Sequence, residues 1–396
     1  MANVSSSNGL EKRPKLRFPG FDEPWKETTL SALFSKSTQK NTDGHITNVI
    51  CNSARLGLIP QREYFDKDIA NSDNTSGYYI IRQNDFVYNP RKSSDAPYGP
   101  ISSYKYAEDG IVSPLYLCFH AKGEINPLYY EWYFRSSAWH RYIYMSGDSG
   151  ARHDRVSIKD DTFFAMPINL PSEQEQSKIA SFLQSLDERI AAQERLVASL
   201  KKYKRGVTEA IFTKDLRFTT KGAPYPQWDK KYVGDICKIQ TGKSNTQDET
   251  SQGSYPFYVR SPIVRKSNRY LFDCEAVLTV GDGVGTGKVF HYVTGKFDLH
   301  QRVYAMTDFK IVSGKYFYYY FSHFFYDRVM RMTAKTSVDS VRYEMIDKMT
   351  IQIPCHEEQQ QIVSFLDCLE HSVIEAEKTL NLLEKLKSGC LQQLFI

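Results

Sequence analysis

The chain contains one long segment twice. Residues 171–212 and 354–395 align without gaps at a constant offset of 183, and 14 of the 42 positions are identical. A repeat of this length constrains the fold more than any single motif, because both copies must adopt the same structure. Identical positions include Glu175 and Glu358, Gln176 and Gln359, Ser181-Phe182-Leu183 and Ser364-Phe365-Leu366, Gly206 and Gly389, and Phe212 and Phe395.

Both copies have the apolar spacing of a coiled-coil seam. Apolar residues recur at alternating steps of four and three, with Gln193 as the one polar interruption in the first copy. Each copy follows a proline and has acidic residues in its first turn, as the start of a helix favours. We expect two long helices that pair with each other in antiparallel fashion; the alternative is that each helix only covers its own domain. The predicted helix-pairing residues are Ile179, Leu183, Leu186, Ile190, Val197, Leu200, Ile362, Leu366, Leu369, Val373, Leu380 and Leu383.

The repeat extends upstream of the helices, more weakly. Leu16-Arg17-Phe18 recurs as Leu216-Arg217-Phe218, and Trp25 recurs as Trp228. Short strand-like runs broken by Gly, Pro, Asn and Asp follow in both halves, and then come tyrosine-rich helical stretches. We predict an α+β fold in which two mixed α/β units are joined by two long antiparallel helices. The predicted domains are an N-terminal arm 1–24, a first unit 25–168, a first helix 169–213, a linker and second unit 214–351, and a second helix 352–396.

Composition excludes several classes of protein. With 24% charged and 41% hydrophobic residues among 396, the chain has ordinary globular proportions. No apolar run approaches the ~20 residues of a membrane helix, and the polar N-terminus does not resemble a secretion signal, so we expect a cytoplasmic protein. The seven cysteines are scattered without a C-x-x-C pair, which favours reduced thiols over disulfides or a zinc site. The net charge of +5 permits nucleic acid as a partner.

A duplicated unit on paired helices suits a reader of double-stranded DNA. Dimeric DNA readers place their two halves on half-sites separated by a fixed distance. One chain with two diverged units would read a split, asymmetric site, and the helices would set the gap. A two-headed coiled-coil scaffold that binds proteins, without DNA specificity, fits this architecture nearly as well.

Several motifs resemble the specificity subunits of type I restriction–modification systems. The pattern P-x-x-x-E-Q-x-x-I-x-S-F-L at 171–190, its weaker copy at 354–373 and the K-x-K-x-G-x-x-x-x-x-F endings are similar to repeated regions of that family. The segments 85–89 and 110–114 also look like parts of such subunits, as does the glycine-rich stretch 281–290 with the following H-Q-R-V. The resemblance covers nearly the whole chain beyond its first dozen residues.

The resemblance implies a non-catalytic subunit in a larger complex. Each globular unit would be a target recognition domain that reads one half of a bipartite DNA site. The helices would set the spacer and dock two methyltransferase subunits, and restriction (motor) subunits would join that core. S-adenosylmethionine, ATP and Mg would bind the partner subunits and not this chain. The second helix departs from the family pattern at His356, Glu357 and 370–372, which puts its docking contacts in doubt.

Motifs that suggest catalysis fail in detail. Residues 281–288 resemble a phosphate-binding loop, but Asp282 replaces a required glycine and Val289 replaces the Mg-binding hydroxyl residue. The plain interpretation is a turn between strands; a further one is a loop that approaches DNA phosphates. Asp308-Phe309-Lys310 is only a fragment of a nuclease site, and Asn89-Pro90 does not continue into the tetrapeptide of an amino-methyltransferase.

DNA contacts are expected from basic and amide side chains on loops. Arginine and lysine recognise the O6 and N7 atoms of guanine, and asparagine or glutamine recognises adenine. The alternative for each residue is a solvated surface position. The tyrosine tracts are expected in the core. The candidate DNA-binding residues are Arg91, Lys92, Ser93, Tyr98, Arg152, His153, Arg155, Arg260, Arg265, Lys266, Asn268, Arg269, Lys288, Arg302, Lys335 and Thr336.

Overall fold

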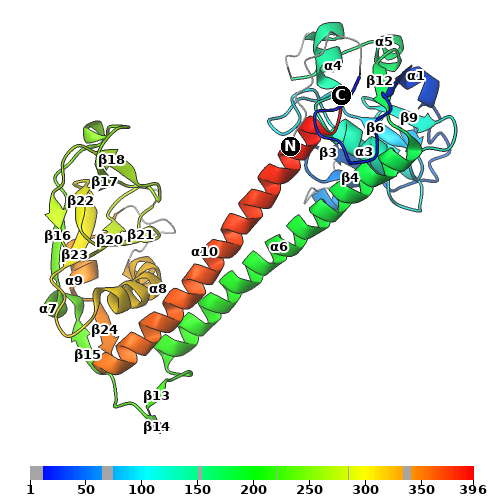
Figure 1. Cartoon of the computed structure of the whole chain (residues 1–396). Helices are drawn as coiled ribbons and strands as arrows, with labels where there is room; N and C mark the ends of the chain where they lie inside the picture. The colour runs from blue at the N-terminus through cyan, green and yellow to red at the C-terminus, as the bar shows by residue number, and fades with distance from the viewer. Residues whose placement is uncertain (1–11, 65–74, 150–153, 221, 284, 333–339) are drawn as a thin grey trace. The chain divides into compact units, whose positions relative to one another are not determined.

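The computed structural model contains two compact units that share two long helices (Figure 1). It describes residues 12–64, 75–149, 154–220, 222–283, 285–332 and 340–396. Unit 1 comprises the chain up to Glu194 together with Thr379–Ile396, and unit 2 comprises Arg195–Lys378. Helices α6 (Glu173–Thr213) and α10 (His356–Gln393) therefore each contribute one part to each unit. The expected boundaries treat each long helix as a segment of its own, whereas the two units divide each helix between them. Those boundaries therefore remain a prediction.

Unit 1 is built on a four-stranded sheet of order β2-β9-β6-β7. One face of the sheet carries the larger core, with α3 and the start of α6, and the other face carries a smaller core around Ile50 and Tyr104. Successive side chains along a strand point to opposite faces of the sheet. Phe86 and Phe119 therefore belong to the larger core, and Val87 and Cys118 to the smaller one. Its elements before α6 are β1 (Lys26–Thr29), α1 (Leu30–Leu33), β2 (Phe34–Ser37), β3 (Ile50–Ser53), β4 (Gly57–Pro60), α2 (Gln61–Tyr64), β5 (Tyr79–Ile81), β6 (Phe86–Tyr88), β7 (Ile101–Ser103), β8 (Gly110–Val112), β9 (Leu117–Ala121), α3 (Pro127–Arg135), α4 (His140–Ser146), β10 (Asp148–Ser149), β11 (Val156–Ser157), α5 (Asp160–Phe164) and β12 (Pro167–Leu170).

Unit 2 repeats this plan with a sheet of order β16-β23-β20-β21. A second sheet has the order β18-β17-β22-β19. Its strands are interspersed along the chain with those of the first sheet. The long helix α8 packs its buried tyrosines and phenylalanines into the larger core. The elements between α6 and α10 are β13 (Thr219–Thr220), β14 (Ala223–Pro224), β15 (Asp229–Tyr232), α7 (Val233–Ile236), β16 (Lys238–Thr241), η2 (Thr246–Asp248), β17 (Tyr255–Tyr258), β18 (Arg265–Ser267), β19 (Phe272–Asp273), β20 (Ala276–Val280), β21 (Phe290–Val293), β22 (Lys296–Leu299), β23 (Val303–Thr307), α8 (Gly314–Met332), α9 (Tyr343–Asp347) and β24 (Thr350–Ile353).

The internal repeat is visible in strand register. In unit 1, β1 pairs antiparallel with β12, and Lys26 lies opposite Leu170; in unit 2, β15 pairs with β24, and Asp229 lies opposite Ile353. Leu170 and Ile353 are separated by the helix offset of 183. The two units are therefore copies of one mixed α/β fold, as the sequence predicted.

Within each unit the two long helices run antiparallel. In unit 1, Asp187 near the start of α6 forms an ion pair with Lys387 near the end of α10. In unit 2, Lys204 near the end of α6 pairs with Glu370 near the start of α10. The two pairs correspond in the repeat, since Asp187 aligns with Glu370 and Lys204 with Lys387. Glu370, which departs from the family pattern in type, thus keeps an equivalent contact.

The predicted seam lies on the covered side of both helices. Five of its members on α6 and three on α10 are buried, and the remaining four are half-buried. The half-buried members are Leu200, Leu369, Leu380 and Leu383.

Each helix ends in the core of the unit built from the other repeat. Phe395, at the end of the second repeat, packs on Tyr129 and Tyr133 of α3, with ring centroids 5.7 and 6.0 Å apart. Phe212, its counterpart in the first repeat, packs on Tyr316 and Tyr320 of α8, at 5.9 and 5.1 Å. The tyrosine tracts are core residues, as expected, and the two halves of the sequence exchange their helix ends.

The segments before each unit are fixed by matching contacts. The Leu16 N–H donates to the carbonyl of Gln393 at 3.0 Å, and the Leu216 N–H donates to that of Ala210 at 2.9 Å. Ala210 and Gln393 differ by 183, so the acceptors occupy the same place in the repeat. In unit 2 one continuous stretch makes this contact, whereas in unit 1 two distant segments of chain make it.

Two features bear on the class of protein. All seven cysteines are free thiols. Among the described residues, no helix combines the length and apolar character needed to cross a membrane.

Candidate nucleic-acid interface

Polar loops of unit 2 gather at one edge of its sheet. Strand β23 is antiparallel to both β16 and β20, so its start lies beside their ends. Strands β17 and β22 run parallel and end near the same turn, where the His300 N–H donates to the carbonyl of Tyr258 at 3.0 Å. The residues that follow β16, β17, β20 and β22 are thereby brought close to those that precede β23. In the sequence these residues are spread over about sixty positions, from Thr241 to Arg302.

Asp282 binds two arginines at this edge; we call Arg260, Asp282 and Arg302 the Asp282 cluster. Arg260 Nη1 lies 3.2 Å from one carboxylate oxygen of Asp282, and Arg302 Nη1 lies 2.6 Å from the other. The two arginine side chains are 45% and 59% exposed, and that of Asp282 is 18% exposed. The cluster therefore presents a net positive charge to solvent while its carboxylate stays mostly covered.

The buried side chain of His300 contacts the backbone of the Asp282 cluster. Its Nδ1 accepts a hydrogen bond from the Arg302 N–H at 3.1 Å, and its side chain is buried. Burial lowers the pKa of His300, and the positive charges of Arg260 and Arg302 lower it further while Asp282 opposes them. A neutral imidazole is thus favoured beside the two arginines.

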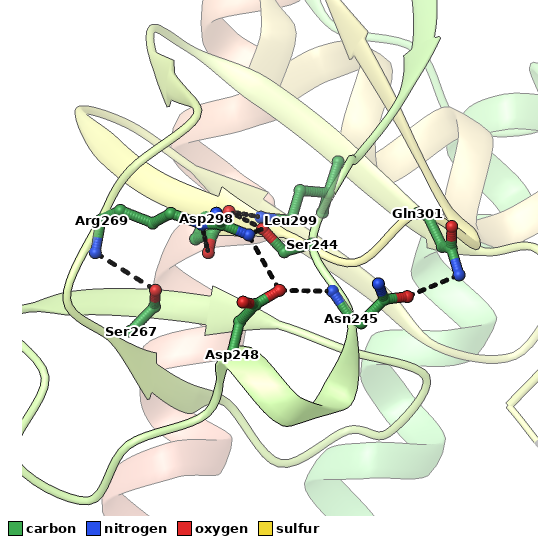
Figure 2. Close-up of polar contacts among 8 residues, drawn as sticks. All are labelled: Ser244, Asn245, Asp248, Ser267, Arg269, Asp298, Leu299 and Gln301. Atoms are coloured by element: carbon green, nitrogen blue, oxygen red, sulfur yellow. Dashed lines mark hydrogen bonds and ion pairs between the residues drawn. The ribbon is translucent and has the colours of Figure 1, made fainter.

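Arg269 is the centre of a second group, the Arg269 cluster, which Figure 2 shows. Its Nη2 donates to Asp248 at 2.8 Å and to the Ser244 hydroxyl at 3.0 Å. Ser244 also lies 2.6 Å from Oδ1 of Asp298, whose side chain is fully buried. The other oxygen, Oδ2, has no hydrogen-bond partner among the described residues and lies 3.7 Å from Arg269 Nε. The Nη2 group of Arg269 is therefore engaged within the protein, while the side chain as a whole stays exposed.

A glutamine–asparagine contact joins the two clusters. Gln301, next to Arg302, donates to the side-chain oxygen of Asn245 at 2.6 Å (Figure 2). The Asn245 N–H in turn donates to Asp248 at 2.7 Å. The turn at 300–302 thus holds amide and guanidinium groups in one row.

The other candidates of unit 2 lie outside this row. Arg265 on β18 pairs with Glu249 at 3.2 Å, and Lys288 lies 5.2 Å from the centre of the Tyr326 ring. Lys266 and Asn268 are exposed. The loop that carries Lys288 connects the adjacent strands β20 and β21, which confirms the turn interpretation of the glycine-rich stretch. Lys335 and Thr336 lie outside the described residues.

Unit 1 presents a corresponding edge. The Val156 N–H donates to the carbonyl of Pro90 at 2.9 Å, just as the Val341 N–H donates to that of Gly281 at 2.7 Å. Arg91 therefore stands at the position of Asp282, and it lies opposite Arg155 in the local strand pairing. Each unit therefore has an equivalent sheet edge, and the two edges differ in charge at this position.

The remaining candidates of unit 1 surround this position. Arg91 is exposed, with Nε 3.9 Å from Asp154, and the Lys92 N–H donates to the carbonyl of Asp154 at 2.8 Å. The buried Nε of Arg155 has no hydrogen-bond partner among the described residues. Ser93 is exposed, and Tyr98 is half-buried with its ring 4.9 Å from that of His140. Arg152 and His153 lie outside the described residues.

Sequence reasoning missed several polar residues at the edge of unit 2. In the sequence, Asp282 stands out only as a departure from a phosphate-loop motif, and Gln301 only as part of a family motif. The others, Ser244, Asn245, Asp248 and Asp298, have no distinctive neighbours in the sequence. Their grouping follows from strand order, which no local pattern reveals.

This arrangement is suited to recognition. Exposed guanidinium and amide groups in a row can donate hydrogen bonds to base edges and phosphates. Among the described residues, no group of three or more His, Cys, Asp or Glu could hold a metal ion.

Comparison with known proteins identifies a family with two matching regions. A family model described as the type I restriction modification DNA specificity domain matches residues 30–202 and 226–387. The specificity subunit of the type I restriction enzyme EcoDI from Escherichia coli is 28% identical over 142 residues, which are 36% of this chain and 31% of that protein. The MjaVIII specificity subunit from Methanocaldococcus jannaschii is 24% identical over 180 residues, 42% of each protein. The matched stretches thus span less than half the length of these relatives.

Solved structures of low sequence identity have the same fold. The S subunit of a type I restriction–modification system from M. genitalium matches with a TM-score of 0.62 at 14% identity, over 97% of this chain and 99% of that one. The HsdS subunit from Thermoanaerobacter tengcongensis matches with a TM-score of 0.53 at 17% identity, over 96% and 97%.

Proposed function

Because the chain belongs to the family of type I restriction modification DNA specificity domains, we propose that it is the DNA-sequence specificity subunit of a type I restriction–modification complex. Each unit reads one half of a bipartite, asymmetric DNA site. The observation that carries this proposal is the repeated sheet edge, which presents Arg91 and Arg155 in unit 1 and the Asp282 cluster in unit 2. Different side chains on the same edge are what a reader of two different half-sites requires.

The long helices set the spacer between the half-sites and dock two methyltransferase subunits. Several large apolar side chains stand exposed on both helices, and a docked partner would cover them, which supports a role in docking. In unit 2 these are Leu196, Tyr203 and Ile374; in unit 1 they are Phe182, Leu382 and Leu386.

Chemistry in the complex belongs to the partner subunits. Methyltransferase subunits supply S-adenosylmethionine-dependent methylation, and restriction subunits supply ATP- and Mg-dependent translocation and cleavage. This chain contributes recognition and no cofactor site. It acts where the host DNA is, in the cytoplasm.

The test is to express the chain with a type I methyltransferase and to sequence the methylated positions of the host DNA. A split motif with a constant gap is expected. Binding of the complex to that motif should weaken steeply with salt, because phosphate contacts release counterions. A complex that assembles but enriches no split motif, or whose DNA binding is independent of salt, contradicts the proposal and favours a protein-binding scaffold.

A further inference from the structure

The Asp282 cluster is a poor device for stability. Exposed ion pairs contribute about 0–1 kcal/mol, and holding two long side chains in one place costs conformational entropy. What Asp282 does achieve is to fix the positions of two exposed guanidinium groups.

The geometry leaves the recognition edge of each arginine outside the ion pair. Both arginines meet Asp282 through Nη1, at 3.2 and 2.6 Å, so Nε and Nη2 are not part of that contact. Two adjacent N–H groups of a guanidinium match the O6 and N7 acceptors of guanine in the major groove. A side chain that is already held in place loses less entropy when it binds.

Charge favours a base over a phosphate at this place. The shared carboxylate offsets part of the positive charge of the pair, and it repels a phosphate that approaches the same arginines. The O6 and N7 edge of guanine carries only partial negative charge, so the carboxylate repels it less than it repels a phosphate. Arg265 and Lys288, which lie outside the cluster, remain suited to phosphates.

We propose that Arg260 and Arg302, held by the shared carboxylate of Asp282, form a base-reading site of unit 2 that selects guanine. Asp282 is a positioning residue and does not itself contact the base. The inference is confined to unit 2, because Arg91 stands at the place of Asp282 in unit 1. It rests on the proposed function, since it specifies how one unit of the specificity subunit reads its half-site.

The experiment uses the full chain in complex with its methyltransferase and a library of DNA with randomised sites. Sequencing of the methylated molecules gives the base preference at every position for the wild type and for Arg302→Ala, Arg260→Ala and Asp282→Asn. Lys231→Ala is the matched control, because Lys231 is an exposed cation on β15, remote in sequence from the cluster. Arg302→Lys keeps the charge and removes the fork, and it replaces Arg302→Ala if that variant does not fold.

We expect each arginine variant to lower the guanine preference about tenfold or more at one or two positions of a single half-site. Asp282→Asn should relax the same positions to a smaller degree, while the other half-site, the spacer and the Lys231→Ala motif stay as in the wild type. A weakening that is uniform over all sequences would assign the arginines to phosphates and overturn the inference, as would an unchanged motif or one in which neither half contains guanine. A wild-type complex without any split motif would instead overturn the proposed function itself.

Discussion

Arg217 donates two hydrogen bonds to the buried carboxylate of Glu358, at 2.9 and 2.7 Å, across 141 residues of sequence. The Trp228 indole N–H donates a third, at 2.8 Å, to the same group. In unit 1, Arg17 and Glu175 repeat the two-fold contact, with both distances 2.8 Å. Each ion pair fixes the segment that leads into a unit against the first turns of the helix that leaves it.

Replacement of Glu358 by glutamine should destabilise unit 2 by about 2–4 kcal/mol, because it leaves the half-buried guanidinium of Arg217 and the buried indole of Trp228 without a charged partner. Glu175→Gln should destabilise unit 1 less. The indole N–H of Trp25, the counterpart of Trp228, has no hydrogen-bond partner among the described residues, so this variant breaks no indole hydrogen bond. Denaturant unfolding of the two variants measures the difference. Glu357→Gln, at the exposed neighbouring position, is the control; equal effects of all three variants would contradict this account.

Phe395→Ala should destabilise unit 1, although Phe395 belongs to the second half of the sequence. Removal of a buried phenylalanine costs about 3–5 kcal/mol, and this ring packs on Tyr129 and Tyr133. Hydrogen exchange of amides in α3 measures the effect. Phe212→Ala should instead loosen α8, and protection lost from the same helix in both variants would show that the exchange of helix ends is wrong.

Stability of unit 2 should fall as the pH drops below about 6.5. Burial lowers the pKa of His300 in the folded state, so the unfolded chain takes up this proton first, and the loss grows until the pH reaches the folded-state pKa. His140 in unit 1 and His291 in unit 2 are lowered by burial in the same direction. His300→Gln should therefore reduce the pH dependence of the unfolding midpoint of unit 2 without abolishing it. The exposed His371→Gln serves as the control, and a steeper dependence in His300→Gln would contradict the sign.

Leu382→Asp and Leu386→Asp should weaken binding of the methyltransferase and leave the fold intact. Their side chains are 66% and 51% exposed on α10, so a charge there disturbs a partner surface and not the core. Co-purification with the methyltransferase and circular dichroism measure the two effects separately. Leu186→Asp, at a buried seam position, should by contrast unfold the helix pair of unit 1; normal assembly of all three variants would remove the helices from the docking surface.

Insertion of four residues into one long helix should lengthen the gap in the recognised DNA and keep both half-sites. Four residues extend a helix by about 6 Å, which corresponds to one or two base pairs. Sequencing of methylated host DNA measures the gap. An insertion that alters a half-site while the gap stays constant would mean that the helices do not set the spacer.

The sequence predicted the features that depend on local periodicity. Heptad spacing, a proline and acidic residues lie within each helical segment, so both helices and their covered faces could be predicted. The helices run antiparallel, as expected, but which positions meet has no such local signal: the contacts are Asp187 with Lys387 in unit 1 and Lys204 with Glu370 in unit 2. Equivalent seam positions such as Leu186 and Leu369 therefore belong to different units.

The candidate site was predicted only in part, for a physical reason. Charge and loop position were sufficient to select Arg260, Arg269 and Arg302, because cations on loops are visible in a sequence. Their carboxylate partners were not visible, since Asp282, Asp248 and Asp298 meet them only after four strands have paired. Whether an arginine is free to contact DNA or is already engaged depends on those partners.

The exchange of helix ends makes the two halves of the polypeptide mutually dependent. Residues 1–194 lack the α10 end that covers the α3 tyrosines, and the second repeat lacks the α6 end that covers α8. Neither half can bury its own core when it is produced alone. Two half-length chains supplied together would complete each other by reciprocal exchange of these helix ends.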